Sequence, residues 1–520
     1  GDYVHKGQVI AIDEKINFPI HSSVSGYALV GDTKTINNGK KIKCVVIEND
    51  FKEKYEKSKV VTKKEYTREE FINALRENGI TGLGGSDFPA FLKYDNDNTK
   101  YLLVNGVECE PFVSCDKALM KNSAEEILEA VDKIMTIMNL KKSYIVVKED
   151  STKVINAFTK HIGTYPNISL KLVKDAYPNG WERLVVRDTL GIEYDKYPIE
   201  KGILVSNVST IYAIYEMLKY SRPLTERIIT ITGPGIKKKT NVKVKIGTLA
   251  SEIIASLDGY KKLKNPLFIA GGPMMGKMQS SDSMIDHAVV TKTTGNLLIL
   301  PKDHYLVRRA VKPVQTMIRQ ARTSCIQCRF CTDLCPREQI GHNVKPNQIM
   351  RNLWRQDQIT DVKEFEATFG SAANCSSCGV CEMFACPMGL SPRKMNDYTK
   401  GLLRGLGINP EKNQNTTAKS TIEQRRIPTE RLIARLGLSD YVFHVEPKLI
   451  TDLDVKEVIV PLGQHIGKPA TPVVKVGDMV HAGDLIAEAA EGLSANIHTG
   501  FAGIVTEIGS SGIRISKKEA

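Results

Sequence analysis

Long hydrophobic runs are missing from this 520-residue chain. No stretch approaches the roughly 18 consecutive apolar residues that a membrane-spanning helix needs, so the sequence predicts no transmembrane segment. The first residues, Gly1 to Gly7, lack the charged and apolar regions of a signal peptide. They also lack an initiator methionine, so we expect the natural start of the chain to lie further upstream.

Cysteine is nearly absent outside one segment. Eight of the eleven cysteines lie between Cys325 and Cys386, and Cys44, Cys109 and Cys115 are the exceptions. A secreted disulfide protein spreads its cysteines through the fold, whereas dense C-x-x-C spacing in a large chain is typical of metal ligation in a reducing compartment. We expect Cys109 and Cys115 to be small buried residues rather than redox thiols.

Signatures of nucleic-acid recognition are absent, although the formal net charge is +13. The lysines and arginines are scattered, and no helix-turn-helix, ribonucleoprotein or zinc-finger pattern accompanies them. We therefore predict no nucleic-acid partner, and take the charge to favour solubility and anionic partners such as nucleotide cofactors or acidic proteins. No Ser-His-Asp set, paired carboxylates or open zinc site indicates a separate catalytic centre.

Two cysteine motifs carry the most specific signal. Cys325-x-x-Cys328-x-x-Cys331-x-x-x-Cys335-Pro336 is the bacterial [4Fe–4S] ferredoxin pattern, and Cys375-x-x-Cys378-x-x-Cys381-x-x-x-x-Cys386-Pro387 repeats it with one extra residue. In two-cluster ferredoxins the fourth cysteine ligates the other cluster. We predict two [4Fe–4S] clusters, one on Cys325, Cys328, Cys331 and Cys386, the other on Cys375, Cys378, Cys381 and Cys335. Zinc, which prefers two spaced C-x-x-C pairs, is the less favoured alternative.

The two ends of the chain resemble each other. Gly1-Asp2-Tyr3-Val4-His5-Lys6-Gly7 near the start matches Gly477-Asp478-Met479-Val480-His481-Ala482-Gly483 near the end. Short Val- and Ile-rich runs between Gly-Asp turns predict small all-β units. The pattern resembles the barrel-sandwich hybrid fold of biotinyl and lipoyl carriers, so we expect one such unit at each end, over residues 1–50 and 456–520.

Between the ends, the patterns predict a multidomain chain of α/β, β and helical parts. Residues 60–222 alternate helical and strand patterns, which favours a parallel α/β sheet. Residues 223–300 show the strand–turn–strand–helix order of a β-grasp domain. The cysteines lie among amphipathic helices over residues 305–405, and residues 406–455 are expected to be a polar linker.

A glycine cluster, Gly82-Leu83-Gly84-Gly85-Ser86-Asp87-Phe88-Pro89, follows the first predicted helix of the α/β domain. Such glycines let backbone N–H groups approach a phosphate, whose charge Lys93 could balance. A plain tight turn is the alternative. Polar turns around Asn105, Tyr177 and Asn207 follow predicted strands or lie between elements, where α/β sheets place ligand contacts.

These segments together resemble known flavoproteins. G-L-G-G-x-x-F-P, N-G-x-E-C-E-P, Y-P-x-G and N-V-x-T are similar to the flavin- and NADH-binding core shared by the C subunit of the Rnf electron-transport complex and the flavin subunit of respiratory complex I. The spacing before Cys386, the stretch Arg425-Arg426-Ile427-Pro428 and a sandwich after the clusters resemble the PduS-type cobalamin reductase. The resemblance covers nearly the whole chain and implies that the β-grasp domain is SLBB-like.

The resemblance also implies which residues bind FMN. Ten residues are expected around it: Gly82, Gly84, Gly85, Phe88 and Lys93 hold FMN, Asn105, Glu108 and Glu110 line its isoalloxazine side, and Glu182 and Asn207 lie nearby. Two positions depart from the family. Ser86-Asp87 replaces Ala-Gly and brings a negative charge to the loop, and Trp181 replaces a small residue. Either change could weaken FMN or NADH binding, or reshape the pocket for another donor.

The function that the resemblance implies is electron transfer, in which NADH reduces FMN and two clusters pass single electrons to an acceptor. PduS-like features favour a corrinoid, although the D-x-H-x-x-G corrinoid motif is absent. A protein reductase of amino-acid fermentation, an Rnf-type partner, or a non-flavin iron–sulfur adaptor are the alternatives. We expect a complex member or homo-oligomer in the cytoplasm of an anaerobic bacterium, with a microcompartment as a candidate location.

Overall fold

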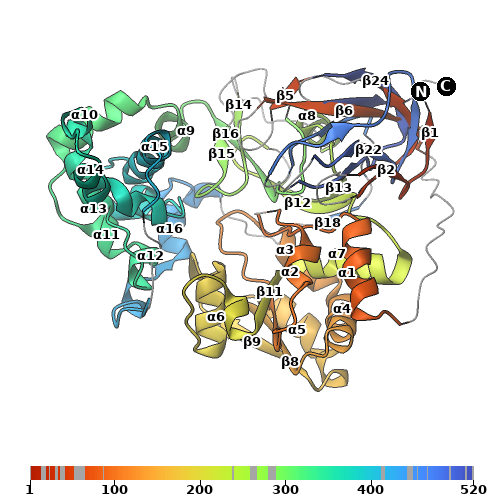
Figure 1. The fold of residues 1–520 in the computed structure, drawn as a ribbon, viewed down its shortest axis with the longest axis horizontal. Coiled ribbons are helices and arrows are strands. Elements are labelled where there is room, and N and C mark those ends of the chain that lie inside the picture. Colours follow the sequence, from red (N-terminus) through yellow and green to blue (C-terminus); the bar gives the residue numbers. More distant parts are fainter. Residues whose placement is uncertain are drawn as a thin grey trace.

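The computed structural model describes residues 2–12, 19–22, 24–29, 33–35, 41–51, 65–85, 87–236, 239–257, 266–278, 288–410, 416–441, 449–451, 453, 455–464, 467–490, 494–509 and 512–517. Figure 1 shows a β-sandwich that carries both chain ends, an α/β block beside it, and a helical block at the far end from the termini. Within the described residues, no helix is both long and apolar enough to cross a membrane.

Strands from both ends of the chain build the sandwich. Its main sheet has the order β1-β4-β21-β24-β25-β19-β6-β5. The strands are β1 (Tyr3–Val4), β4 (Ser25–Leu29), β5 (Thr33–Thr35), β6 (Lys41–Asn49), β19 (Glu457–Pro461), β21 (Met479–His481), β24 (Gly503–Ile508) and β25 (Gly512–Ser516). Two small sheets accompany it: β2 (Val9–Ile12) with β3 (Pro19–His21), and β20 (Thr471–Pro472) with β22 (Leu485–Glu488) and β23 (Ile497–His498).

The expectation of a separate barrel-sandwich unit at each end was wrong, because the two ends share one sheet and one core. Gly26 of β4 lies opposite Val480 of β21. Val24 and Ala28 from the start pack in the same buried cluster as Val480 and Ile513. A Cβ atom on Gly26 would lie 1.3 Å from the backbone nitrogen of Gly503. Glycine therefore permits the close approach of the two halves, and each half supplies part of the apolar interior.

The α/β block is built on a four-stranded parallel sheet, which confirms the alternating pattern. Its order is β11-β7-β8-β9, from β7 (Tyr101–Asn105), β8 (Lys142–Lys148), β9 (Ile168–Val173) and β11 (Ile203–Asn207). The helices and turns are α1 (Arg68–Glu77), α2 (Ala90–Tyr94), α3 (Cys115–Asn122), α4 (Ala124–Ile137), α5 (Thr152–Thr159), η1 (Ile162–Thr164), α6 (Glu182–Leu190), η2 (Pro198–Lys201) and α7 (Val208–Tyr220). Both faces of the sheet are covered, because Leu102 and Val104 pack in one apolar cluster while Leu103 and Val205 pack in another.

A six-stranded sheet connects the sandwich to the rest of the molecule. Its order is β15-β14-β16-β12-β13-β18, from β12 (Glu226–Thr232), β13 (Thr240–Lys245), β14 (Pro266–Ala270), β15 (Lys277–Met278), β16 (Asn296–Pro301) and β18 (Leu449–Ile450). Strand β12 pairs antiparallel with β13 and parallel with β16. Helix α8 (Ala250–Ser256) buries Ile253 and Ile254 in the same core as Ile229 and Val242. Its classification as an SLBB-like β-grasp domain stays a prediction.

The helical block carries the eight clustered cysteines. It contains α9 (Tyr305–Ala310), α10 (Val314–Ser324), α11 (Phe330–Asp333), α12 (Pro336–Gln339), α13 (Pro346–Asn352), η3 (Leu353–Gln358), α14 (Val362–Phe369), η4 (Gly370–Asn374), η5 (Cys381–Ala385) and α15 (Pro392–Gly405). Met317, Ile349, Phe369 and Met395 form its core. Pro336 stands at the start of α12, where a missing backbone N–H costs nothing.

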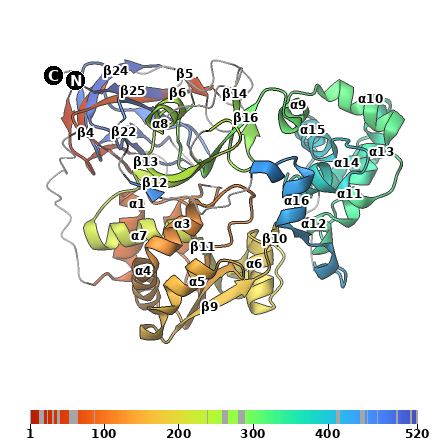
Figure 2. The same ribbon diagram turned by 180° about the vertical axis from the view of Figure 1, so that it is seen from behind.

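The segment expected to be a linker, residues 406–455, contains regular structure in its described part. It forms η6 (Glu423–Arg425), β17 (Ile427–Pro428), α16 (Thr429–Arg435) and η7 (Ser439–Tyr441). Strand β17 pairs antiparallel with β10 (Ala176–Tyr177) of the α/β block. Residues 416–429, named the strap below, lie in blue between the α/β block and the helical block in both views (Figures 1 and 2).

Candidate functional site

A cavity of about 850 Å³ lies where the α/β block, the six-stranded sheet and the cysteine loops meet. This volume falls within the roughly 300–1,000 Å³ that is usual for cofactor pockets. The structure brings together all ten residues expected around FMN, which line the wall: Gly82, Gly84, Gly85, Phe88, Lys93, Asn105, Glu108, Glu110, Glu182 and Asn207. Their roles toward a flavin remain proposals.

The glycine loop forms one side of the cavity. The N–H of Gly82 donates to the carbonyl of Phe88 over 2.8 Å, so the loop folds back on itself before α2. Gly85 has a φ of +106°, and a Cβ atom built on it would meet nothing within 4 Å. A Cβ on Gly84 would lie 3.2 Å from the Cβ of Asn207. The loop therefore offers exposed backbone beside open space, a cradle that fits a phosphate or a ring edge.

Lys93 and Glu182 form an ion pair at this wall, with 3.1 Å between Nζ and Oε2. About one third of each side chain is exposed, so the pair faces solvent as well as the cavity. The hydroxyl of Tyr194 donates to the other carboxylate oxygen of Glu182 over 3.4 Å. A phosphate bound near Lys93 would therefore share that cation with Glu182.

Glu108 is bonded to the start of helix α3. Its carboxylate accepts the backbone N–H groups of Asp116 at 3.0 Å and Lys117 at 3.3 Å, and the Cys115 thiol donates to it at 3.2 Å. The positive end of the helix favours an anion here, but burial raises the pKa of Glu108 to about 7, and the neighbouring Asp116 carboxylate raises it further. Glu108 is consequently a cavity-lining group that can hold or release a proton near neutral pH.

Glu110 closes the loop Gly271–Gly276 against the α/β block. Its carboxylate accepts the N–H groups of Met274 at 3.1 Å and Met275 at 2.8 Å. A Cβ atom on Gly272 would lie 2.2 Å from the carboxylate, so a side chain does not fit there. Burial raises the pKa of Glu110 to about 7 against the effect of these bonds and of Arg393. The bonds of Glu110 thus connect three parts of the cavity wall.

The eight cysteines of the helical block fall into two groups. Burial raises the pKa of Cys331 to about 12, and the thiols of Cys386, Cys325 and Cys328 raise it further. Burial also raises the pKa of Cys381, with further contributions from Cys375, Cys378 and Cys335. Each group therefore combines three cysteines of one motif with the last cysteine of the other, in the same sets as the crossed ligands expected from the spacing.

Local backbone geometry turns the cysteines inward. Gln327, Arg329 and Ser377, which stand between the cysteines, have φ values of 56°, 66° and 59°. These left-handed residues curl each loop so that successive cysteines can face one centre. The N–H of Ser377 donates to the Cys375 sulfur over 3.3 Å, and that of Leu390 to the Cys386 sulfur over 3.3 Å. Such bonds to sulfur tune the potential of a cluster.

A single metal ion has no ready site in the described residues. No group of three or more His, Cys, Asp or Glu side chains closes around one point there. A [4Fe–4S] cube attaches one thiolate to each of four irons, so its ligands stand further apart than those of one zinc ion. Open groups of four cysteines suit a cube in this respect.

The two cysteine groups differ in their distance from the cavity. The inner cysteine group, Cys335, Cys375, Cys378 and Cys381, reaches the wall itself, because Cys378 lines the cavity together with Ser376. The outer cysteine group, Cys325, Cys328, Cys331 and Cys386, reaches the surface at Cys328. Its neighbours Ile326 and Phe330 are 60% and 47% exposed. The inner group is therefore next to the flavin cavity and the outer group faces solvent.

Comparisons with known proteins agree with this arrangement. The Nuo51 FMN-binding domain family matches residues 75–216, and the 4Fe-4S dicluster domain family matches residues 324–391. The RnfC barrel-sandwich hybrid domain family matches residues 1–52 together with 445–519, in line with the single sandwich. Over 459 residues the chain is 36% identical to the cobalamin reductase PduS of Citrobacter freundii, covering 86% of this chain and 97% of that protein. The chain belongs to the PduS cobalamin reductase family.

Other relatives extend the comparison. The cobalamin reductase PduS of Salmonella typhimurium is also 36% identical, over 86% of this chain and 96% of its own length. A component of the proton-translocating ferredoxin:NAD(+) oxidoreductase complex of Clostridium ljungdahlii, its RnfC-type protein, is 30% identical over 65% of this chain and 71% of its own length. This member of the PduS family is thus a flavin and iron–sulfur oxidoreductase of electron transfer, with FMN and two [4Fe–4S] clusters as its cofactors.

Asp87 shows how this PduS-family chain accommodates its departure from the glycine loop. The residue is fully buried, has a φ of 49°, and lines the cavity, while Ser86 lies outside the described residues. Burial raises the pKa of Asp87 to about 6, and Lys292 and Arg227 lower it as the cations that face it. The negative charge that was expected to oppose a phosphate is therefore countered by two buried cations.

Trp181, the second departure, belongs to the contact between blocks. The Arg337 guanidinium lies over its ring at 4.6 Å, and the ring packs against the buried cluster of Leu184, Ile340 and Ile422. Cation–π stacking of this kind stabilises a contact. The large side chain therefore fills a gap between α6 and the cysteine block and also borders the cavity.

Several cavity residues were not found from the sequence. Asp116, Arg227, Lys292 and Cys378 all belong to the site or face it. Arg227 carries one weak signal, as a charged residue at the start of an otherwise apolar strand. Lys292 carries none, because it lies about 200 residues from Asp87 and meets it through the tertiary fold alone.

Proposed function

We propose that the protein oxidises NADH and passes the electrons through FMN and two [4Fe–4S] clusters to a corrinoid. Two relatives of almost the same length are cobalamin reductases, which supports the acceptor. A relative that belongs to a ferredoxin:NAD(+) oxidoreductase complex supports the donor. The observation that carries the proposal is the shared wall, on which Cys378 of the inner cysteine group borders the same cavity as the glycine loop.

FMN, when bound, accepts a pair of electrons as hydride and returns them singly. The backbone of Gly82, Gly84 and Gly85 is placed to receive its phosphate, with Lys93 supplying charge. Phe88 and Asn105 border the same space. Leu83 donates its N–H to the Thr210 hydroxyl over 2.9 Å, which attaches the loop to α7 and keeps the cradle in place.

Proton handling falls to the buried carboxyl groups. Hydride brings one proton's worth of hydrogen with two electrons, so a proton has to leave the site when the electrons depart one at a time. Glu108 lines the cavity and its pKa is about 7, so it can take up that proton at neutral pH. Asp116, bonded to the Asn207 amide at 2.8 Å, lies next in line from Glu108.

The clusters are proposed to lie on the two cysteine groups, the inner one first and the outer one last. In this order Cys328 marks the exit, because it is exposed. The exposed Ile326 and Phe330 beside it favour a second candidate, in which the acceptor is a protein that docks at the outer group. A place beside a microcompartment and an SLBB-like role for the six-stranded sheet are further proposals from the same relatives.

An anaerobic assay separates these acceptors. Protein reconstituted with iron, sulfide and FMN is mixed with NADH and cob(II)alamin, and the corrinoid spectrum is followed. Corrinoid reduction that needs both NADH and the clusters supports the proposal. Rapid reduction of a small ferredoxin with no change in the corrinoid would replace the corrinoid by a protein acceptor.

A further inference from the structure

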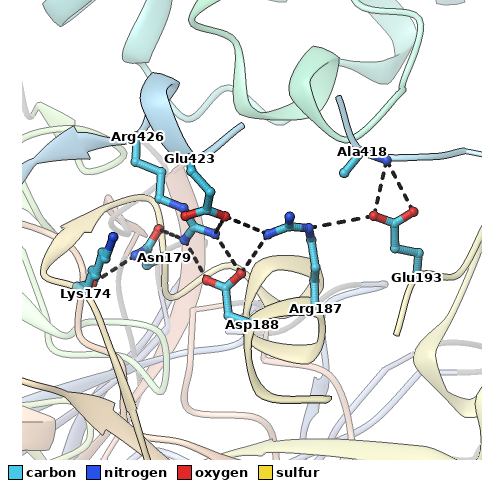
Figure 3. Close-up of polar contacts among 8 residues, drawn as sticks. All are labelled: Lys174, Asn179, Arg187, Asp188, Glu193, Ala418, Glu423 and Arg426. Atoms are coloured by element: carbon cyan, nitrogen blue, oxygen red, sulfur yellow. Dashed lines mark hydrogen bonds and ion pairs between the residues drawn. The ribbon is translucent and has the colours of Figure 1, made fainter. Parts of the chain in front are cut away.

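The strap, residues 416–429, is attached to the α/β block by a network of charges. The Arg426 guanidinium donates to both carboxylate oxygens of Asp188, at 2.5 and 2.6 Å, and to the Asn179 side chain at 2.8 Å (Figure 3). Arg187 bonds to Asp188 at 3.1 Å and to Glu423 at 3.0 Å. The Arg426 and Asp188 side chains are 10% and 13% exposed, so this two-pronged pair is well shielded from water.

Backbone groups extend the same attachment. The N–H of Ala418 donates to both oxygens of Glu193 at 3.2 Å (Figure 3), and the N–H of Thr416 donates to Asp195 at 2.9 Å. At the far end of the strap, the Thr429 hydroxyl donates to Asp175 at 2.7 Å. The whole length of the strap is therefore bonded to the α/β block.

The strap is bonded equally to the cysteine block. The N–H of Lys419 donates to the Gln339 carbonyl at 2.8 Å, and the Thr421 hydroxyl donates to the Gln339 side chain at 2.9 Å. Gln339 lies in α12, the helix that begins directly after Cys335. Ile422 packs between Leu184 of α6 and Ile340.

A second connection runs through strand β17. Ile427 pairs with Tyr177, whose hydroxyl donates to the carbonyl of Cys378 at 2.7 Å. Just beyond the strap, Arg435 donates to the carbonyl of Cys386 at 2.8 Å. The strap and α16 thus touch the α/β block and the loops of both cysteine groups.

We propose that the strap sets the separation between the flavin cavity and the inner cysteine group, with Arg426 as its positioning residue, and this inference rests on the proposed function. Arg426 does not line the flavin cavity, so it acts through Asp188 and β17 rather than on a cofactor. Contacts between blocks of one chain permit relative motion unless something fixes them. Each transfer moves one electron from FMN, reduced by NADH, to the inner cluster, and its rate depends steeply on distance.

The test compares Arg426→Gln and the charge-keeping Arg426→Lys with a matched control, Arg425→Gln. Arg425 is the neighbouring strap residue, and its half-buried side chain makes no hydrogen bond to another described residue. The first measurement is hydrogen–deuterium exchange, which requires no donor. We expect faster exchange at Lys419 and Ile422 in Arg426→Gln, less in Arg426→Lys because lysine cannot make the two-pronged bond, and none in the control.

The second measurement is rapid mixing of reconstituted protein with NADH, followed separately at the flavin and cluster bands. We expect Arg426→Gln to keep its cofactor content and its rate of flavin bleaching, while cluster reduction slows by about ten- to a hundredfold, the size of effect that ångström displacements cause. Arg426→Lys should lie between, and Arg425→Gln should match the wild type.

Unchanged cluster reduction in Arg426→Gln, with faster exchange, would overturn the positioning role. Equal slowing of flavin and cluster reduction would assign Arg426 to general stability instead. If NADH does not bleach the wild type, the donor in the proposed function is wrong. Transfer is then started by light-driven reduction of FMN with a deazaflavin and an amine, so that the strap is judged on the same two rates.

Discussion

The Tyr177 hydroxyl donates a 2.7 Å hydrogen bond to the carbonyl of Cys378, and both residues line the flavin cavity. Tyr177 belongs to the α/β block and Cys378 to the inner cysteine group. This bond therefore joins the expected flavin site to the expected first cluster. It places the two cofactors on opposite sides of one shared wall.

Removing this bond should disturb the inner cluster before it disturbs the flavin. Tyr177→Phe keeps the ring and leaves a carbonyl without its donor, so we expect a loss of about 1 kcal/mol in stability. The electron paramagnetic resonance spectrum of one cluster should shift while FMN content stays unchanged. Tyr197→Phe is the control, because Tyr197 is 64% exposed. Identical spectra for Tyr177→Phe and the wild type would argue against the shared wall.

Crossed ligation predicts which cluster a single cysteine controls. Cys386→Ala should damage the cluster held by Cys325, Cys328 and Cys331, because those thiols face Cys386. Iron content should fall while the other cluster keeps its spectrum. Cys109→Ala, outside both groups, should leave the iron intact. Damage confined to the cluster of Cys375, Cys378 and Cys381 would reject the crossed assignment.

Lys93 is predicted to hold the flavin phosphate. Lys93→Ala should lower FMN occupancy after reconstitution without removing iron, because the cradle loses its cation and leaves Glu182 unopposed. We expect a loss of roughly tenfold in FMN affinity, in line with one charge-assisted contact. Lys133→Ala provides a control, since its ion pair with Glu129 lies on α4, which contributes no residue to the cavity wall. The proposed role is wrong if flavin content does not change.

Glu110 should make stability depend on pH. Burial raises its pKa from 4.5 to about 7 in the folded protein, so the folded state binds a proton more tightly than the unfolded state. Its contribution is complete below pH 4.5 and disappears as pH rises to about 7, a change of roughly 3 kcal/mol. Glu110→Gln should flatten this decline in urea unfolding curves of the cofactor-free protein. Glu149→Gln, a carboxylate outside the cavity wall, should leave the decline in place.

The sequence determined the local chemistry well. The cysteine spacing defined two motifs because a cube demands thiolates at short, fixed intervals. The flavin candidates converged on one cavity because Asn105 and Asn207 end parallel strands, and such ends meet at one edge of the sheet. In both cases a short segment carries the whole constraint.

Other features depend on contacts between distant segments. The two sandwich halves were taken for separate units, since a pairing such as Gly26 with Val480 leaves no mark on local patterns. Residues 406–455 looked like a polar linker because the partners of Arg426 lie more than 230 positions away, in α6 and at Asn179. Glu110 was expected at the flavin ring, yet its bonds go to a loop of the six-stranded sheet.

The most direct test of the account is an anaerobic titration of the reconstituted protein with NADH, followed by visible absorbance. The shared wall between the glycine loop and Cys378 predicts that the flavin band bleaches first and the iron–sulfur shoulder follows. Bleaching by dithionite with none by NADH would contradict NADH as the donor. Bleaching of the flavin band alone would contradict the path from the cavity to the inner cysteine group.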